Sequence, residues 1–144
     1  MSAAAITTNS DARPAPSESS GATRGSVTVL LRLEAGIALV ASIMAYRAVG
    51  GSWWLFAGLF LVPDLSMLGY LVNRRIGAAA YNFGHTYLSP AALAAAGFAA
   101  HAPTTYLWAL IWAAHISFDR LVGYGLKYPQ AFGATHLGHV GKRP

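Results

Sequence analysis

The chain has 144 residues, of which 55% are hydrophobic and only 10% are charged. This balance, with a mean hydropathy of +0.43, excludes an ordinary soluble domain and predicts a membrane protein of one domain. The absence of cysteine excludes disulfides, thiolate metal sites and a cysteine nucleophile. The net charge of +5 is spread over the ends of apolar stretches rather than gathered on one face, so no nucleic-acid partner is predicted.

Residues 1–26 are rich in Ser, Ala, Thr and Pro and contain no apolar run. Such a segment cannot bury enough apolar surface to offset the entropy lost on ordering. It also lacks the apolar core of a cleavable signal peptide. We therefore predict a disordered N-terminal tail.

Four apolar stretches follow, each near the length of about 20 residues that crosses a bilayer as a helix. They cover residues 27–46, 52–72, 77–99 and 104–122. Their links are short and carry the Gly, Asn and Pro of tight turns, so neighbouring helices must run antiparallel. The predicted fold is an all-α membrane protein, an antiparallel four-transmembrane-helix bundle over residues 27–122. Residues 123–144 are too polar to span and are predicted to form a cytoplasmic or interfacial tail.

The distribution of Lys and Arg sets the orientation of the predicted bundle. Arg47 stands alone on one side of the membrane. The opposite side holds Arg13, Arg24, Arg74, Arg75, Lys127, Lys142 and Arg143. Both termini are therefore predicted to be cytoplasmic.

Pro63 interrupts the second stretch directly before Asp64. Proline has no backbone N–H, so the carbonyl near Leu59 loses its helical partner. We predict a kink or break in the second helix at this point. Such a break would turn Asp64 and free backbone groups into the bundle.

Ionisable residues occur inside all four stretches. Counted at about 1.5 Å per residue from the cytoplasmic ends, the side chains at similar depth are Glu34, Asp64, His85 and His115, with Asp119 nearer the inner surface. An Asp or Arg at the centre of a span costs about 2.5–3.5 kcal/mol on insertion scales. These side chains must therefore face inward and pair with one another, or surround water or an ion.

The residue types in this layer are those of a metal or acid–base site. His115 and Asp119 are four residues apart on one helix face, and imidazole and carboxylate groups are ligands for zinc, iron or manganese. A metal bound there could activate water. We predict that the metal ligands, which are also the catalytic residues, are Asp64, His85, His115 and Asp119, with Glu34 and Asn82 in support.

Other readings stay open. A His–Asp pair without a metal can do acid–base chemistry, because the carboxylate orients the imidazole. His85 and His115 also match the axial ligands of haem b in a haem- or quinone-linked redox subunit. Proton-coupled transport would require a homo-oligomer, since four helices make a thin wall for a pore. In the remaining reading the polar layer only holds the helices of a non-catalytic membrane module together.

The C-terminal tail has aromatic residues and Lys127 that suit the cytoplasmic interface, and it is predicted to fold back as a cap. Lys127 and Arg120 would suit an anionic headgroup or phosphate, or serve as structural anchors. His136 and His139 form an H-x-x-H pair that could bind a metal, although a solvated tail is the simpler reading.

Three segments in order carry a resemblance to a known family: GGSWWLFAGLFLVPDLSMLGYL, YNFGHTY and HISFDRLVGYGLKYPQAFGATHLG. They resemble the uncharacterised bacterial integral membrane proteins called domain of unknown function 4260, over about residues 31–138. The resemblance implies a bacterial cytoplasmic-membrane protein with four helices and brings no assigned activity. The polar positions of the family correspond here to Asp64, Asn82, His85, His115, Asp119, Arg120, Lys127 and His136.

A looser similarity links the chain to membrane-bound metal-dependent hydrolases, although their denser His-rich run near the first helices is missing here. Together these observations predict a bacterial inner-membrane protein whose partners are the bilayer, a lipid-like small molecule and a second copy of the chain. The predicted chemistry uses a divalent metal or shuttles protons on the lipid-like substrate.

Overall fold

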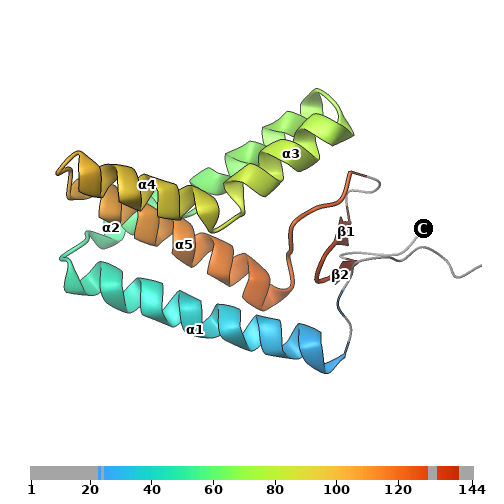
Figure 1. Cartoon of the computed structure of the whole chain (residues 1–144), viewed down its shortest axis with the longest axis horizontal. Helices are drawn as coiled ribbons and strands as arrows, with labels where there is room; N and C mark the ends of the chain where they lie inside the picture. Colours follow the sequence, from blue (N-terminus) through green and yellow to red (C-terminus); the bar gives the residue numbers. More distant parts are fainter. Residues whose placement is uncertain (1–22, 24, 130–132, 140–144) are drawn as a thin grey trace, which may run out of the picture.

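The structure is a computed structural model that describes Thr23, residues 25–129 and residues 133–139. The predicted disordered tail, residues 1–26, lies almost wholly outside this part of the chain. Within the described residues the fold is mainly helical, as predicted, with one small β-hairpin (Figure 1). The elements are α1 (Ser26–Ala48), α2 (Trp53–Phe60), the 3-10 helix η1 (Val62–Leu71), α3 (Arg74–Gly84), α4 (Leu88–Ala99), α5 (Thr104–Val122), β1 (Ala134–Thr135) and β2 (Gly138–His139).

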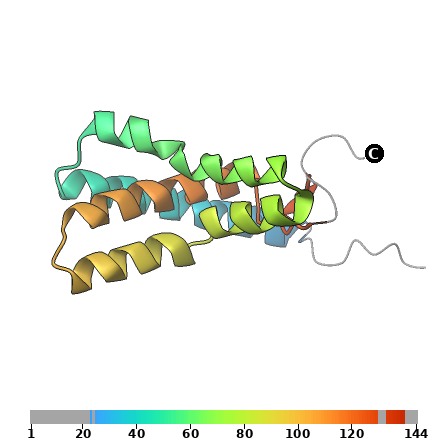
Figure 2. The same cartoon turned by 90° about the horizontal axis from the view of Figure 1, so that it is seen from above.

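The helix α5 lies at the centre of the molecule. It packs along α1, and it also contacts α2, η1 and α4 (Figures 1 and 2). The helix ends at Gly123, whose left-handed backbone (φ 107°) suits glycine because the residue has no Cβ. Near this end Arg32 of α1 donates from Nε to the carbonyl of Leu121 at 2.7 Å, so the two longest helices are joined where α5 stops.

The second apolar stretch, residues 52–72, forms the second pass along the molecule. Its helix is broken at Pro63, as the sequence predicts. α2 ends at Phe60, and η1 begins at Val62 with Pro63 in its first turn. The missing N–H of Pro63 prevents a continuous α-helix, and the chain continues as a tighter 3-10 helix. Asp64 therefore lies in the first turn of η1, beside the break.

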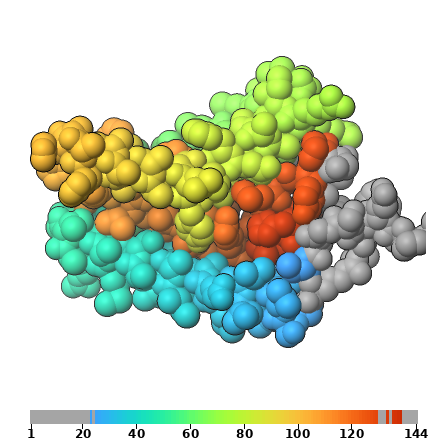
Figure 3. Space-filling view, viewed as in Figure 1, coloured from blue at the N-terminus to red at the C-terminus, as the bar shows by residue number. Residues whose placement is uncertain are grey.

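The prediction of one continuous helix over residues 77–99, the third pass, is wrong. This pass consists of α3 and α4, separated at His85–Tyr87. Pro90 supplies the physical reason, because its ring and missing N–H are incompatible with a helix that continues past the carbonyl of Thr86. In the first turn of α4 the proline is tolerated, since an N–H there has no intrahelical partner. In the space-filling view of Figure 3, the green atoms of α3 and the yellow atoms of α4 extend in different directions from the break.

Side chains donate hydrogen bonds to the carbonyls at this break; those of Phe83 and Gly84 depend on them, whereas the Tyr81 carbonyl also accepts the backbone N–H of His85. The donors and acceptors are His85 Nδ1 to Tyr81 O (2.9 Å), Ser89 Oγ to Phe83 O (2.5 Å) and Trp112 Nε1 to Gly84 O (2.6 Å). Gly84 also allows η1 to approach α3 closely, because a Cβ at this position would lie 2.8 Å from Ser66 Oγ. The break is thus a hydrogen-bonded feature that holds His85 at the end of α3.

Two of the passes are long and apolar enough to cross a membrane: α1, and the run Trp53–Leu71 formed by α2 and η1. Only 6% of each of these windows is buried inside the molecule. α1, for example, exposes Leu33, Ile37, Val40 and Met44. A core helix of a soluble protein would be mostly buried, so this exposure weakly supports contact of these helices with lipid.

The C-terminal segment folds back onto the helices, as predicted for a cap. Lys127 forms a bridge with Thr135, and β1 pairs with β2 as an antiparallel hairpin. Asn82 of α3 fastens the segment with two hydrogen bonds, from Nδ2 to Lys127 O (2.9 Å) and from Lys127 N to Oδ1 (2.7 Å). Thr23, just before α1, donates from its backbone N–H to His136 O at 2.9 Å. The N-terminal end of α1 and the C-terminal segment therefore lie at the same end of the molecule.

Candidate metal centre

Four side chains predicted from the sequence converge at the centre of the helices. Asp64 comes from the first turn of η1, His85 from the end of α3, and His115 and Asp119 from successive turns of α5. One ligand atom from each of the four lies within 4.8 Å of all the others. The structure therefore brings together the residues that the sequence selects, while their role as ligands stays a prediction.

The two imidazoles and two carboxylates form a compact cluster of donor atoms. His85 Nε2 lies 3.4 Å from Asp64 Oδ1 and 3.4 Å from Asp119 Oδ2. His115 Nε2 lies 3.6 Å and 3.8 Å from the same two oxygens. The two Nε2 atoms are 3.2 Å apart. All these atoms face a common centre.

The orientation of the His85 ring is fixed by a hydrogen bond at Nδ1, the ring nitrogen that does not belong to the cluster. Its Nδ1 is 2.9 Å from the carbonyl oxygen of Tyr81, which can only accept, so Nδ1 carries the hydrogen. In the neutral ring Nε2 then presents a lone pair to the cluster, which is the tautomer that binds a metal. The Tyr81 ring stacks on the imidazole at 3.8 Å, and its hydroxyl donates to Asp119 Oδ2 at 3.3 Å. Tyr81 thus positions two of the four side chains.

His115 is buried more completely but is held differently. Its residue is 1% exposed, and the ring of Phe60 contacts it edge to face at 5.3 Å. Its Nδ1 has no hydrogen-bond partner within the part of the chain that the structure describes. Most metal-binding histidines donate their second N–H, so His115 departs from the usual pattern.

Access to the cluster is one-sided. The side chains of His85, His115 and Asp119 are 3%, 2% and 15% exposed, whereas that of Asp64 is 40% exposed. Water or a substrate can therefore approach the cluster along Asp64.

Lys127 covers the cluster from the C-terminal segment. Its residue is buried, and its Nζ lies 4.3 Å from the centre of the Tyr81 ring and 5.2 Å from that of Tyr70. Burial lowers the pKa of this amine, while the nearby carboxylates of Asp119 and Asp64 oppose the shift. The lysine places a positive charge beside the centre.

The residues predicted to support the site have other places. Asn82 fastens Lys127 through the backbone, so it acts on the cluster only indirectly. Glu34 lies on α1 outside the four-residue cluster and lines a separate pocket with Arg120 and His136. The H-x-x-H reading is only partly described: His136 accepts from Leu126 N–H at Nδ1 (2.9 Å), and the side chain of His139 lies outside the description.

Two contributors were missed by the sequence reasoning. Tyr81 lies four residues before His85, the spacing that puts two side chains on one helix face, and this was the available signal. The proximity of Lys127 to the cluster had no such signal, because it depends on the fold of the C-terminal segment.

An apolar cavity of about 330 Å³ is lined by residues of α2, η1, α3, α4 and α5 and by none of the four cluster residues. Pro63 and Gly84, which line it, directly precede Asp64 and His85 in the chain. The other lining residues are Leu59, Val62, Ser66, Phe83, Leu93, Trp108, Ile111 and Trp112. A volume near the lower end of small-molecule pockets, with such walls, suits an alkyl chain.

Most of the spacings between the donor atoms are close to those around a tetrahedral ion. With ligand bonds of about 2.0–2.2 Å, a tetrahedral zinc site separates neighbouring ligand atoms by about 3.3–3.6 Å. Five of the six distances between the cluster atoms range from 3.2 to 3.8 Å, and the sixth, between the two carboxylate oxygens, is at most 4.8 Å. Two neutral imidazoles and two carboxylates would also balance the charge of a divalent ion.

Residues 28–140 match the family model described as Domain of unknown function (DUF4260). The chain belongs to this family. Its description assigns no activity, so the match confirms the resemblance and leaves the chemistry to the site. No curated protein and no solved structure matches the chain.

Proposed function

We propose that this member of the DUF4260 family is a membrane protein that binds a divalent metal ion through Asp64, His85, His115 and Asp119. The observation that carries the proposal is the convergence of four ligand atoms within 4.8 Å of one another, from three elements. Two carboxylates this close repel each other unless a cation or protons lie between them. A divalent ion would satisfy both, together with the Nε2 lone pair of His85.

The proposed membrane arrangement has four spans. α1 and the α2–η1 run are apolar and exposed along their length, and the α3–α4 pass and α5 lie beside them. At the break between α3 and α4, side chains donate to the carbonyls of Phe83 and Gly84, as a span requires where its helix is interrupted. We propose the bacterial cytoplasmic membrane with both termini on the cytoplasmic side, from the distribution of basic residues.

The proposed substrate is lipid-like. A chain lying in the apolar cavity would bring its polar end to Asp64, the most exposed of the four side chains. When bound, a divalent ion supplies Lewis-acid activation of water or of a substrate carbonyl or phosphoryl oxygen. Tyr81 would hold Asp119 and His85 in place, and the apolar walls would limit the access of water.

Metal analysis of the detergent-purified full chain tests the proposal. We expect near-stoichiometric zinc, iron or manganese that is lost in His115→Ala, with the helical circular dichroism spectrum retained. His101→Asn is the matched control, because His101 lies in the link between α4 and α5 and the substitution suits its left-handed backbone (φ 51°). Metal-free protein from several growth media, even after incubation with each ion, would refute the metal site.

A second candidate is acid–base chemistry without a metal, which the contacts of His115 favour. If its hydrogen is on Nε2, it can be donated to His85 Nε2 at 3.2 Å, and Nδ1 is left as an acceptor rather than a donor without a partner. This reading would be favoured if the purified protein contains no metal and the cellular phenotype is lost in both His85→Gln and Asp64→Asn. If the same variants changed only the thermal stability, the cluster would be a packing device.

Axial ligation of a haem fits this geometry poorly. The two Nε2 atoms lie within hydrogen-bond distance of each other, which leaves no room for a porphyrin plane between them. The absence of a Soret band in purified protein would agree with this reading.

A further inference from the structure

A second pocket, distinct from the metal centre, lies between α1, α5 and the C-terminal segment. Its volume is about 220 Å³. Its polar lining residues are Glu34, Tyr87, Arg120 and His136, and its apolar ones are Leu31, Ala35, Ala38 and Leu137. Pockets for drug-sized ligands measure about 300–1,000 Å³, so this one suits a small polar group rather than a whole lipid.

Arg120 is positioned in this pocket without a carboxylate partner. Its guanidinium lies over the ring of Tyr87, 4.4 Å from the centroid. Tyr87 is itself fixed, because its hydroxyl pairs with Ser117 Oγ at 2.9 Å and that hydroxyl donates to Ala113 O at 2.7 Å. Among the described residues the pairs of opposite charge within 4 Å are all His–Asp pairs of the metal centre, so Arg120 keeps its donors for another acceptor.

His136 adds a neutral donor. Its Nδ1 accepts the N–H of Leu126, so in the neutral ring the hydrogen is on Nε2. Burial and the neighbouring charge of Arg120 lower the pKa of His136, which favours this neutral form. The pocket thus offers a guanidinium fork and an imidazole N–H.

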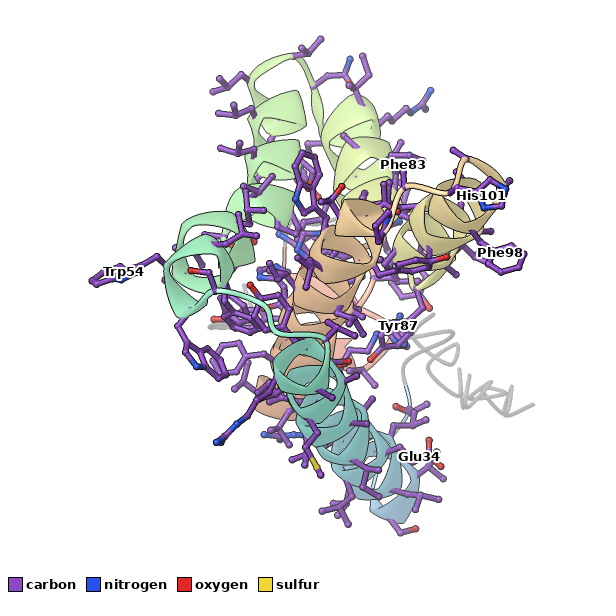
Figure 4. The ribbon with its side chains drawn as sticks, turned by 90° about the vertical axis from the view of Figure 1, so that its left-hand side faces the viewer. Glu34, Trp54, Phe83, Tyr87, Phe98 and His101 are labelled. Carbon is purple, nitrogen blue, oxygen red and sulfur yellow. The ribbon has the colours of Figure 1, made fainter. Side chains whose placement is uncertain are left out.

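Glu34 supplies the opposite charge on the other wall. In Figure 4, Glu34 and Tyr87 lie on the same side of the molecule, whereas Trp54 points away from it. Glu34 and Arg120 line one cavity, yet no salt bridge joins them. Glu34 is exposed and Arg120 is half-buried, so both charges are accessible, and a ligand that carries both opposite charges would pair with each of them.

We propose that this pocket binds a phosphate ester that carries a primary ammonium group, the chemistry of a phosphoethanolamine headgroup. Arg120 and His136 hold the phosphate, and Glu34 holds the ammonium. The charges that line the pocket sum to zero, as do those of the ligand, so a ligand of one sign would leave a wall unmatched. The planar fork of Arg120 favours bidentate binding of phosphate oxygens.

The test is calorimetric titration of the detergent-solubilised full chain with glycerophosphoethanolamine. We expect saturable binding that is tighter than that of glycerol phosphate, which lacks the amine, and of glycerophosphocholine, whose quaternary amine cannot donate. Arg120→Gln should weaken binding by about tenfold to a hundredfold. The matched control Arg75→Gln, an exposed arginine on α3, should leave binding unchanged.

Two further variants separate the parts of the assignment. Glu34→Gln should abolish the preference for glycerophosphoethanolamine over glycerol phosphate, while Arg120→Lys should retain part of the affinity. Metal content is measured in the same samples, because this pocket can fail while the metal centre stands. Equal binding by wild type and Arg120→Gln, no saturable binding in any medium, or equal competition by glycine would overturn the proposal.

The source of the headgroup is decided in nanodiscs. Copurified phosphatidylethanolamine counted by native mass spectrometry, and lost in Arg120→Gln, identifies a membrane lipid. Binding of glycerophosphoethanolamine with no retained lipid identifies a free phosphate ester.

Discussion

Asp119 and Arg120 are neighbours in α5, yet they belong to two sites that hold their charges in opposite ways. In the proposed metal centre the acidic and basic side chains converge, with imidazole nitrogens 3.4–3.8 Å from carboxylate oxygens. In the headgroup pocket, defined by Glu34, Tyr87, Arg120 and His136, a cation and an anion face a cavity of about 220 Å³ without a salt bridge. The spacing of the charged side chains therefore indicates which kind of ligand each site can bind.

The difference follows from the helix geometry. Successive residues of a helix are about 100° apart, so Asp119 faces η1 and α3 while Arg120 turns toward α1 and the C-terminal segment. A cluster of converging lone pairs suits a small cation. Separated charges suit a larger ligand that bears both signs. The two sites should respond independently to substitution, and this independence can be tested.

The largest expected effect is a reciprocal loss. Asp119→Asn should weaken zinc binding by about a hundredfold or more, above the range for outer-shell residues, and leave glycerophosphoethanolamine binding intact. Arg120→Gln should do the reverse. Both ligands are titrated against both variants by calorimetry, and a variant that loses both would break the comparison.

Tyr81→Phe should affect only the metal centre. The substitution removes the hydroxyl that donates to Asp119 Oδ2 and keeps the ring that stacks on His85. Metal affinity should fall by about tenfold, the lower end for an outer-shell partner. Tyr87→Phe, which removes the hydroxyl bound to Ser117, is the control from the other pocket. Equal metal affinity in wild type and Tyr81→Phe would count against the positioning role.

Trp112→Phe tests the break that holds His85. The Gly84 carbonyl loses its donor, and an unsatisfied buried acceptor costs about 1–3 kcal/mol of the free energy of unfolding. We expect a lower melting temperature, recorded by circular dichroism in detergent, together with weaker metal binding. Trp54→Phe, an exposed tryptophan of α2, should leave both unchanged.

Lys127→Met should have the smallest effect and the opposite sign. Removing a positive charge near Asp64 and Asp119 should raise zinc affinity by about tenfold or less, because a nearby ammonium repels a divalent ion. The backbone bonds from Lys127 to Asn82 do not depend on the side chain and should persist. Lower affinity in this variant would mean that Lys127 supports the centre rather than opposing the cation.

The sequence was sufficient for those features that follow from local or compositional constraints. The cost of ionisable residues in apolar stretches predicts that Asp64, His85, His115 and Asp119 come together, and the structure confirms this; Glu34, selected by the same rule, is instead exposed on α1. Pro63 determines the break of the second pass, because a missing N–H acts on its own helix. Pro90 acts in the same way on residues 77–99, where the prediction of one continuous helix is wrong.

Contacts between segments that are distant in the sequence could not be predicted from local or compositional constraints. Arg120, Glu34 and His136 share a pocket only because α1 packs on α5 and the C-terminal segment returns to both. Lys127 is held near the centre by the amide of Asn82, 45 residues earlier, and by its bridge with Thr135. Periodicity and depth assign each residue a face and a level in its own helix. Which faces meet depends on the packing of whole helices. The second pocket therefore could not be predicted from the sequence, because its walls come from separate segments.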